Sequence, residues 1–295
     1  IYTLNRHYPN NQININPAIN SNHQEVRQSI SQRTRSKNTL NHDQNLSVEQ
    51  IFAIMTLDEI PTPETYQEAI KSSQSEEWKK SIKEEQDSLI NLETFQVVPR
   101  PFTKKAIQSR YVFKIKTDDQ GRIARFKTRL VAKGYTQIKG VDFFDTFSPA
   151  LRLSSFRFLL STAVLKKFSI YHLDVQTAFL NGDLAEEIYM EIPEGFDAIK
   201  EDRRSHVLKL NKSIYGLKQA SRVWNEKFTT TIVSMNFVQS QADPCIFIKY
   251  DCNNNNGEPV AIIGLFVDDC FVLGQDEEVE EVKNQLMSKF NMHDL

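Results

Sequence analysis

The chain has 295 residues, of which 40% are hydrophobic and 25% charged, and its formal net charge is −2. This ordinary globular composition excludes a wholly disordered, a collagen-like and a disulfide-scaffold protein, and the length allows one large domain or two smaller ones. No apolar run approaches the roughly 18–20 residues that span a bilayer, and the first residues lack a signal-peptide core. We therefore expect an intracellular protein with no membrane partner.

The cysteine and terminal residues add two expectations. An odd number of cysteines without a C-x-x-C pair (Cys245, Cys252 and Cys270) indicates reduced thiols rather than a disulfide framework or a structural zinc site. Because the first residue is Ile and not Met, we expect a fragment or a processed product.

Charge is distributed unevenly along the sequence. Residues 100–140 contain twelve Lys and Arg against Asp118 and Asp119, whereas the segment from Gln275 to the end is mainly acidic. The near-zero total therefore hides a polarised molecule.

The first part of the chain predicts a disordered linker. Residues 1–48 hold ten Asn with frequent Ser and Gln, and they show no sustained helical or strand periodicity. Such a segment cannot bury enough apolar area to offset the entropy of ordering it. We place the linker at residues 1–62 and the folded part at residues 63–295.

Hydrophobic periodicity predicts the elements of the folded part in chain order. Helices are expected within 64–93 and over 154–167, 218–235 and 277–290, because apolar residues recur there at helical spacing. Alternation predicts a strongly basic hairpin from strands 111–116 and 122–132. Further strands are expected at 168–175, 187–191, 206–210, 245–250, 260–267 and 271–273, and a short turn after Ala178. Helices and strands mix without βαβ regularity, so the predicted fold class is α+β.

Carboxylates at the ends of apolar strands point to a divalent cation. Asp268 and Asp269 interrupt two apolar strands, and Asp174 lies near the end of another that could pair with them in one sheet. Adjacent carboxylates repel each other, and Mg²⁺ is commonly held by one or two carboxylates together with substrate phosphates. The simpler alternative is a turn, since Asp is common in turns for local reasons.

The basic hairpin fits a polyanionic substrate. Two cations at the three carboxylates could bridge an attacking hydroxyl and a departing pyrophosphate, and phosphates are contacted by Lys and Arg without any particular spacing. The alternative is a solvated charged hairpin, which the block taken alone favours. The carboxylates and the basic block together reverse that preference.

From about Pro63 to the end, the order of segments resembles the reverse transcriptase of copia-type long-terminal-repeat retrotransposons. The resemblance depends on eight segments in the right order and spacing rather than on any single motif. The segments are Trp78 with Glu84 and Glu85, then residues 112–116, 129–135, 145–150, 173–182, 188–190, 212–219 and 266–269.

The resemblance implies a right-hand polymerase fold with fingers and a palm that has an antiparallel sheet, and with the thumb absent or truncated. It implies that Asp174, Asp268 and Asp269 are catalytic aspartates. These three side chains and the Val175 carbonyl would hold two Mg²⁺ ions, for which Mn²⁺ could substitute.

Further residues match the family's substrate-binding segments. The resemblance implies contacts to the incoming nucleotide from Lys127, Arg129, Phe179, Tyr215, Gly216 and Gln219. Phe179 would exclude a ribose 2′-hydroxyl, although a core aromatic and a helix-start turn remain the alternatives for Phe179 and Gly216. Contacts to nucleic acid are implied for Lys114, Lys116, Arg125, Lys133, Lys218 and Phe266. Two positions depart from the family pattern: Phe266 replaces its usual Tyr, and Ser221 replaces its usual Pro.

The implied activity is RNA-directed DNA synthesis. Its partners would be an RNA template, a DNA or tRNA primer and deoxynucleoside triphosphates, with integrase and ribonuclease H in the parent polyprotein. The implied location is the cytoplasm, in a virus-like particle, with the nucleus as the alternative. A second hypothesis is an inactive relic or host-adopted fragment that binds nucleic acid through its basic hairpin. A third, a structural partner protein, has no specific feature in its favour.

Overall fold

The computed structural model describes residues 61–251 and 257–295. The predicted linker over 1–62 and Cys252 lie outside this part of the chain, except for Pro61 and Thr62. The helices predicted from periodicity are confirmed with small shifts at their ends. They are α3 (Tyr66–Lys71), α4 (Ser75–Asn91), α5 (Leu153–Lys166), α6 (Ala220–Ser234) and α7 (Asp276–Lys289), with short 3₁₀ turns η2 (Gly134–Thr136) and η3 (Ala178–Asn181).

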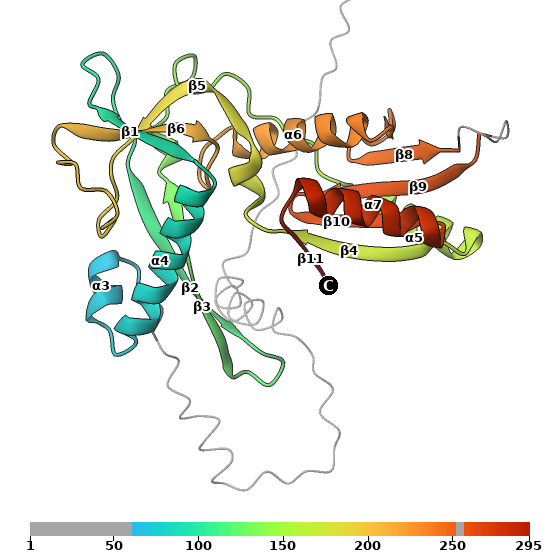
Figure 1. Ribbon diagram of the computed structural model, residues 1–295, viewed down its shortest axis with the longest axis horizontal. Coiled ribbons are helices and arrows are strands. Elements are labelled where there is room, and N and C mark those ends of the chain that lie inside the picture. The colour runs from blue at the N-terminus through green and yellow to red at the C-terminus, as the bar shows by residue number, and fades with distance from the viewer. Residues whose placement is uncertain (1–60, 252–256) are drawn as a thin grey trace, which may run out of the picture. The chain divides into compact units, whose positions relative to one another are not determined.

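The strands form three sheets whose strand pairs are all antiparallel, giving a mixed α and β fold. The basic hairpin is the two-stranded sheet, and β1, β6 and β5 form a three-stranded one (Figure 1). The third has six strands in the order β11-β4-β10-β9-β8-β7. The strands are β1 (Phe95–Pro99), β2 (Ser109–Thr117), β3 (Ile123–Ala132), β4 (Ser169–Val175), β5 (Asp183–Met190), β6 (His206–Lys212), β7 (Val238–Gln239), β8 (Ile246–Tyr250), β9 (Pro259–Phe266), β10 (Asp269–Gly274) and β11 (Met292–Asp294).

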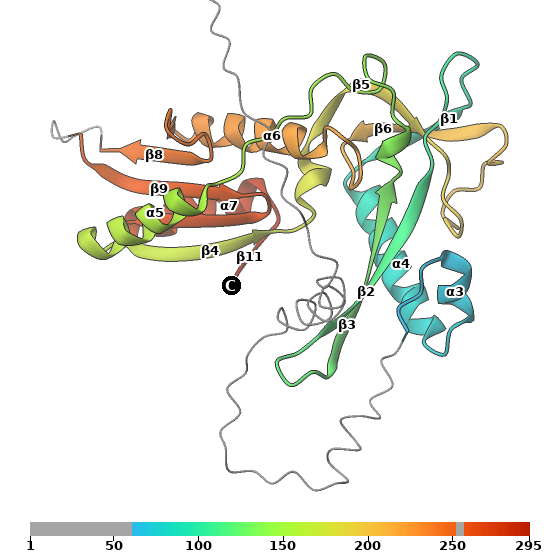
Figure 2. The ribbon, with the colours of Figure 1, turned by 180° about the vertical axis from the view of Figure 1, so that it is seen from behind.

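Helices cover both faces of the six-stranded sheet. Figures 1 and 2 show α7 in front of one face and α5 in front of the other. Trp224 and Phe228 of α6 and Leu286 of α7 pack with one set of strand residues, and Leu159 of α5 packs with the other. Because successive strand side chains alternate between the faces, apolar residues fill both cores, and these strands read as nearly continuous apolar runs.

A third core joins the hairpin to α4. Trp78 is fully buried, and its ring meets Phe113 of β2 and Phe126 of β3 edge to face at centroid distances of 5.1 and 4.7 Å. The buried face of α4 also carries Glu85, whose Oε1 accepts a hydrogen bond from the Leu130 amide at 2.9 Å. The helix α4 thus fixes the hairpin by packing and by polar contacts that include the Glu85 bond to β3.

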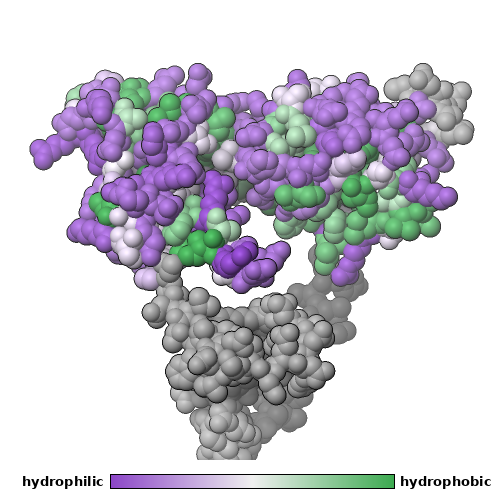
Figure 3. Space-filling model, turned by 60° about the horizontal axis from the view of Figure 1, so that its bottom comes forward, coloured by the Kyte–Doolittle hydropathy of each residue, from purple (hydrophilic) through white to green (hydrophobic). Residues whose placement is uncertain are grey.

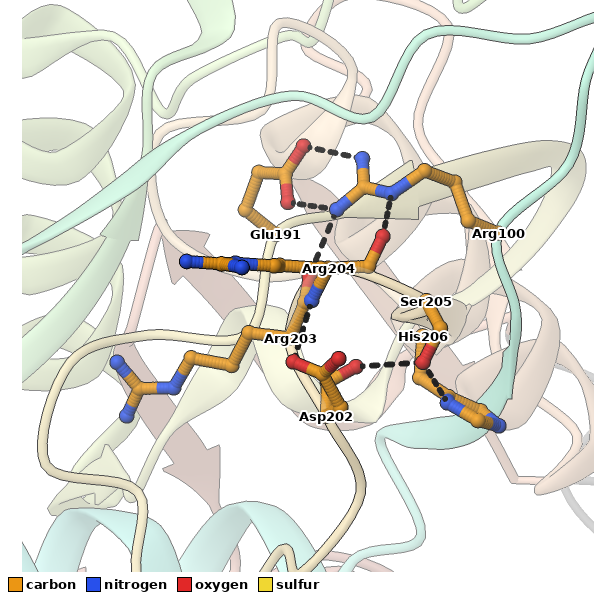
Figure 4. A network of polar contacts seen from close by, with 7 residues as sticks. All are labelled: Arg100, Glu191, Asp202, Arg203, Arg204, Ser205 and His206. Atoms are coloured by element: carbon orange, nitrogen blue, oxygen red, sulfur yellow. Dashed lines mark hydrogen bonds and ion pairs between the residues drawn. The ribbon is translucent and has the colours of Figure 1, made fainter.

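The long connection from β5 to β6 is fixed by one arginine. Figure 4 shows the Arg100 guanidinium facing the Glu191 carboxylate, with Nη1 and Nη2 at 2.7 and 2.6 Å from its two oxygens. The same guanidinium donates to the Arg203 and Arg204 carbonyls. This paired geometry ties the connection to the end of β1, a strand that periodicity did not predict.

Strand limits differ from expectation at the carboxylate pair. The sequence placed both Asp268 and Asp269 in an interruption, but β9 ends at Phe266 and β10 begins at Asp269. A two-residue turn of Val267 and Asp268 joins them, and Val267 has φ 58°. The short strands β7 and β11 were also not predicted. In the described residues no helix is both long and apolar enough to cross a membrane.

We expect Trp78→Ala to lower the free energy of unfolding by about 3–5 kcal/mol, because it removes the aromatic group that packs α4 against the hairpin. Urea unfolding followed by circular dichroism measures the change. Lys80→Ala, at an exposed position on the same helix, is the control and should stay within about 0.5 kcal/mol of wild type. Equal effects of the two changes would mean that the Trp78 packing does not stabilise the fold.

Candidate active site

Pairing of β4 with β10 brings the predicted carboxylates together. Asp269 lies directly opposite Asp174 in the strand register, and the Val175 amide donates to the Asp268 carbonyl at 2.8 Å. The sequence-based expectation that the strand of Asp174 lies beside the Asp268–Asp269 hairpin is therefore confirmed. Residues about 95 positions apart in the chain meet because one sheet contains both strands.

The turn that carries Asp268 is held from α6. The Trp224 indole Nε1 donates to the Val267 carbonyl at 2.7 Å. A β-branched residue at positive φ is uncommon and costs free energy, so the turn persists because the surroundings hold it. Sequence reasoning missed Trp224, since nothing in its helical pattern marks a contact with this turn.

A cleft of about 980 Å³ lies beside these carboxylates. Asp174, Val175 and Asp268 line one side of it, and Asp269 is not among its lining residues. The facing side is the cationic face of the hairpin, made of Lys114, Lys116, Arg125, Lys127 and Arg129. Figure 3 shows mainly hydrophilic residues on this side of the molecule, with hydrophobic patches next to the central hollow.

The cationic face places like charges opposite each other. Lys114 pairs with Lys127 across the strands, and Lys116 pairs with Arg125. Directly opposed like charges destabilise a hairpin, and within residues 61–251 and 257–295 only Arg125 of this face forms an ion pair, with Glu84 at 3.0 Å. The repulsion raises the free energy of the protein alone, and an anion bound in the cleft against this face would reduce it.

Lys127 is a partly buried cation with a lowered pKa. Partial burial, followed by repulsion from Arg129, Lys116 and Arg125, lowers the pKa of Lys127, while attraction to Asp174 opposes the shift. The Lys127 ammonium is therefore close enough to interact electrostatically with the other cations of the face and with Asp174. A bound phosphate would stabilise its charged form.

Arg129 is oriented by an aromatic pair. Its guanidinium carbon lies 4.5 Å from the centre of the Tyr215 ring, and Tyr215 meets Phe179 edge to face at 4.9 Å. Burial, the largest cause, raises the pKa of Tyr215. Phe179 and Tyr215 are thus brought together but are not among the cleft-lining residues, whereas Thr177 and Asn181, on either side of Phe179 in the chain, do line the cleft.

The segment after Tyr215 packs directly on the end of β3. The Ala132 amide donates to the Tyr215 carbonyl at 2.8 Å, and Gly216 has φ 89°. A Cβ at Gly216 would lie 2.2 Å from the Ala132 carbonyl oxygen, so this position requires glycine for both conformation and space.

Five more of the residues expected to contact nucleotide or nucleic acid are not in the lining of this cleft. Gln219 is 1% exposed, and its side chain binds the Gln137 amide and the Asp142 carbonyl, so it is buried and not in the cleft lining. Lys133 lines a second cleft of about 1140 Å³, together with Gly216. The Lys218 ammonium lies over the Phe143 ring, and Phe266 is exposed outside both clefts.

The carboxylates fit a cation that takes few protein ligands. Within residues 61–251 and 257–295, no group of three or more His, Cys, Asp or Glu side chains is placed to hold a metal ion. Two cleft-lining carboxylates nevertheless match the usual Mg²⁺ site, which combines one or two carboxylates with water and substrate phosphates.

Comparison with known proteins decides the family. Residues 92–295 match the family model described as reverse transcriptase (RNA-dependent DNA polymerase). The chain belongs to this reverse transcriptase family. Its homologues include the retrovirus-related Pol polyproteins of copia-type transposons, so the resemblance stated from the motifs is confirmed.

Three relatives show how much of such a polyprotein is represented. The chain is 40% identical to the Pol polyprotein of transposon TNT 1-94 of Nicotiana tabacum over 234 residues, which is 79% of this chain and 17% of that protein. It is 35% identical to that of transposon RE1 of Arabidopsis thaliana, covering 77% and 15% of the two chains. It is 36% identical to the Pol polyprotein of transposon RE2 of the same plant, over 70% of this chain and 14% of that protein. This reverse transcriptase chain thus spans less than a fifth of the length of these relatives.

We expect Gly216→Ala to destabilise the fold far more than Gly121→Ala. Both glycines have positive φ, but a Cβ at Gly121 meets nothing within 4 Å. The control therefore measures the conformational cost alone, about 1–2 kcal/mol. Urea unfolding gives both values, and equal losses would show that the close approach to Ala132 is unimportant.

Proposed function

We propose that this chain is the polymerising part of an RNA-directed DNA polymerase. The observation that carries the proposal is the cleft in which Asp174 and Asp268 face five cations of one hairpin. In the reaction, the primer 3′-hydroxyl attacks the α-phosphate of a deoxynucleoside triphosphate and pyrophosphate leaves. The hairpin and α4 would serve as fingers and the six-stranded sheet as the palm, with no side chain needed as a covalent nucleophile.

The cationic face would bind the triphosphate. Lys127 and Arg129 lie on neighbouring positions of the same strand face, where Lys supplies a point charge and Arg a paired fork for phosphate oxygens. The Tyr215 ring under Arg129 limits the directions in which the guanidinium can point. Lys114, Lys116 and Arg125 continue the cationic face and would contact the nucleic-acid backbone.

Asp174 and Asp268, with the Val175 carbonyl, would hold Mg²⁺, which when bound neutralises charge on the phosphates and the attacking oxygen. Asp269 is proposed to support this pair. Phe179 is proposed to limit the space beside the sugar, resting on Tyr215, while Gln219 would fix the segment behind the cleft. Gly216 remains a proposed contact of the incoming nucleotide, and Lys133, Lys218 and Phe266 remain proposed contacts of the nucleic acid.

The proposed substrates are an RNA template with a DNA or tRNA primer and deoxynucleoside triphosphates. The relatives are Pol polyproteins, so integrase and ribonuclease H parts are proposed for the parent chain. A cytoplasmic virus-like particle is the proposed location.

We expect Asp268→Asn to reduce primer extension on poly(rA)/oligo(dT) with Mg²⁺ by at least about 1000-fold, because it removes a cleft-lining charge needed as the phosphates react. Binding of the RNA–DNA hybrid, measured by fluorescence anisotropy, should change less than about threefold, since the hairpin supplies that affinity. Glu281→Gln, at an exposed carboxylate of α7, is the matched control and should leave both unchanged.

Loss of hybrid binding together with extension would assign Asp268 to structure. Hybrid binding equal with and without Mg²⁺, and no extension by the wild type, would favour the relic that binds nucleic acid without polymerising.

We expect Lys127→Gln to raise the KM for the deoxynucleoside triphosphate by about tenfold, which is the loss of about 1.4 kcal/mol of phosphate attraction. Steady-state extension at varied nucleotide concentration measures the constant. Lys105→Gln, at an exposed lysine outside the cleft lining, should leave KM unchanged. A similar rise in both variants would indicate a general charge effect rather than a triphosphate contact.

A further inference from the structure

His172 lies against the third carboxylate of the candidate active site. Its Nε2 is 2.7 Å from Asp269 Oδ1, and because a carboxylate oxygen only accepts, the imidazole donates this hydrogen bond. The ring stacks on Phe271 at a centroid distance of 4.6 Å with an interplanar angle of 16°. Phe271 in turn packs on Phe156 of α5. The imidazole is therefore fixed by a chain of rings that ends in a helix.

One strand supplies donors to two carboxylates. His172, Asp174 and Gln176 alternate along β4 and its extension, so they share one face of the strand. His172 donates to Asp269, while Gln176 Nε2 donates to Asp174 Oδ2 at 2.6 Å. The two hydrogen-bonded carboxylates differ in position. Asp174, bound by Gln176, lines the cleft, whereas Asp269, bound by His172, is not part of the lining.

We propose that His172 is a positioning residue that keeps Asp269 turned away from the cation-binding pair, so that of these three aspartates only Asp174 and Asp268 line the cleft. This inference rests on the proposed function and limits which aspartates would bind the cation. Residues that orient metal ligands commonly change metal affinity or activity by about 10–100-fold when replaced.

The direction of the effect follows from ligand number. Asp269 is directly opposite Asp174, so without the imidazole donor its carboxylate can rotate toward the pair and add a third negative ligand. Affinity for a hard cation rises with the number of charged ligands. Releasing Asp269 should thus tighten cation binding while disturbing the geometry needed for extension.

The experiment is a double-mutant cycle on the full 295-residue chain, using His172→Phe, Asp269→Asn and the double variant. The readout is Mn²⁺ binding without nucleotide, followed by electron paramagnetic resonance of the free ion. We expect His172→Phe to tighten Mn²⁺ binding by about tenfold, equivalent to about 1.4 kcal/mol, and Asp269→Asn to leave it nearly unchanged. The double variant should return to the Asp269→Asn value.

Two further variants separate positioning from general damage. His172→Gln retains a side-chain donor and should behave as wild type. Tyr171→Phe, which removes the neighbouring bond to Glu280, is the matched control and should not alter Mn²⁺ binding. Urea unfolding of each variant confirms that it is folded.

Unchanged or weaker Mn²⁺ binding in folded His172→Phe, or tightening that persists in the double variant, would overturn the inference. Wild-type binding insensitive to Asp268→Asn would overturn it as well. If the cycle behaves as expected but no variant or wild type extends a primer, the proposed function fails while the role of His172 stands.

Discussion

The antiparallel pairing of β4 with β10 is the constraint on which the candidate active site depends. It sets Asp174 opposite Asp269 and brings the Val175 amide to the Asp268 carbonyl. Shifting this register by one residue would turn every side chain of one strand to the other face. The apolar cores on both faces of the sheet oppose such a shift, so packing far from the carboxylates fixes their position.

A second constraint fixes the hairpin, which lines the same cleft as Asp174 and Asp268. Trp78 packs α4 onto the hairpin, and the Glu85 carboxylate, whose pKa is raised by burial, accepts a bond from the Leu130 amide, next to Arg129 in β3. Opposed cations such as Lys114 and Lys127 are thereby held in a geometry that they would not favour alone. The free energy that fixes them comes from the apolar core, and an anionic substrate would recover part of it.

The adjacent carboxylates Asp268 and Asp269 have different environments because the first belongs to a turn and the second to a strand. Val267 and Asp268 form the turn, held by the Trp224 indole, while Asp269 is the first residue of β10. The sequence suggested that a cation must offset their mutual repulsion. In the structure Asp268 faces the cleft and Asp269 binds the His172 imidazole, which relieves part of that repulsion within the protein itself.

The sequence by itself determined the helices, most strands, the basic hairpin and the family, because periodicity, turn residues and ordered motifs are local properties. It also singled out Asp174 and Asp268 as carboxylates at the ends of apolar strands, and the family resemblance singled out Lys127 and Arg129 in the basic hairpin. Only the tertiary structure decided which of the matched residues reach the cleft: Gln219 is buried against Asp142, and Asp269 lies beside His172. Side-chain direction depends on register and on neighbours distant in the chain, such as Trp224 and Phe271, and no local pattern encodes those contacts.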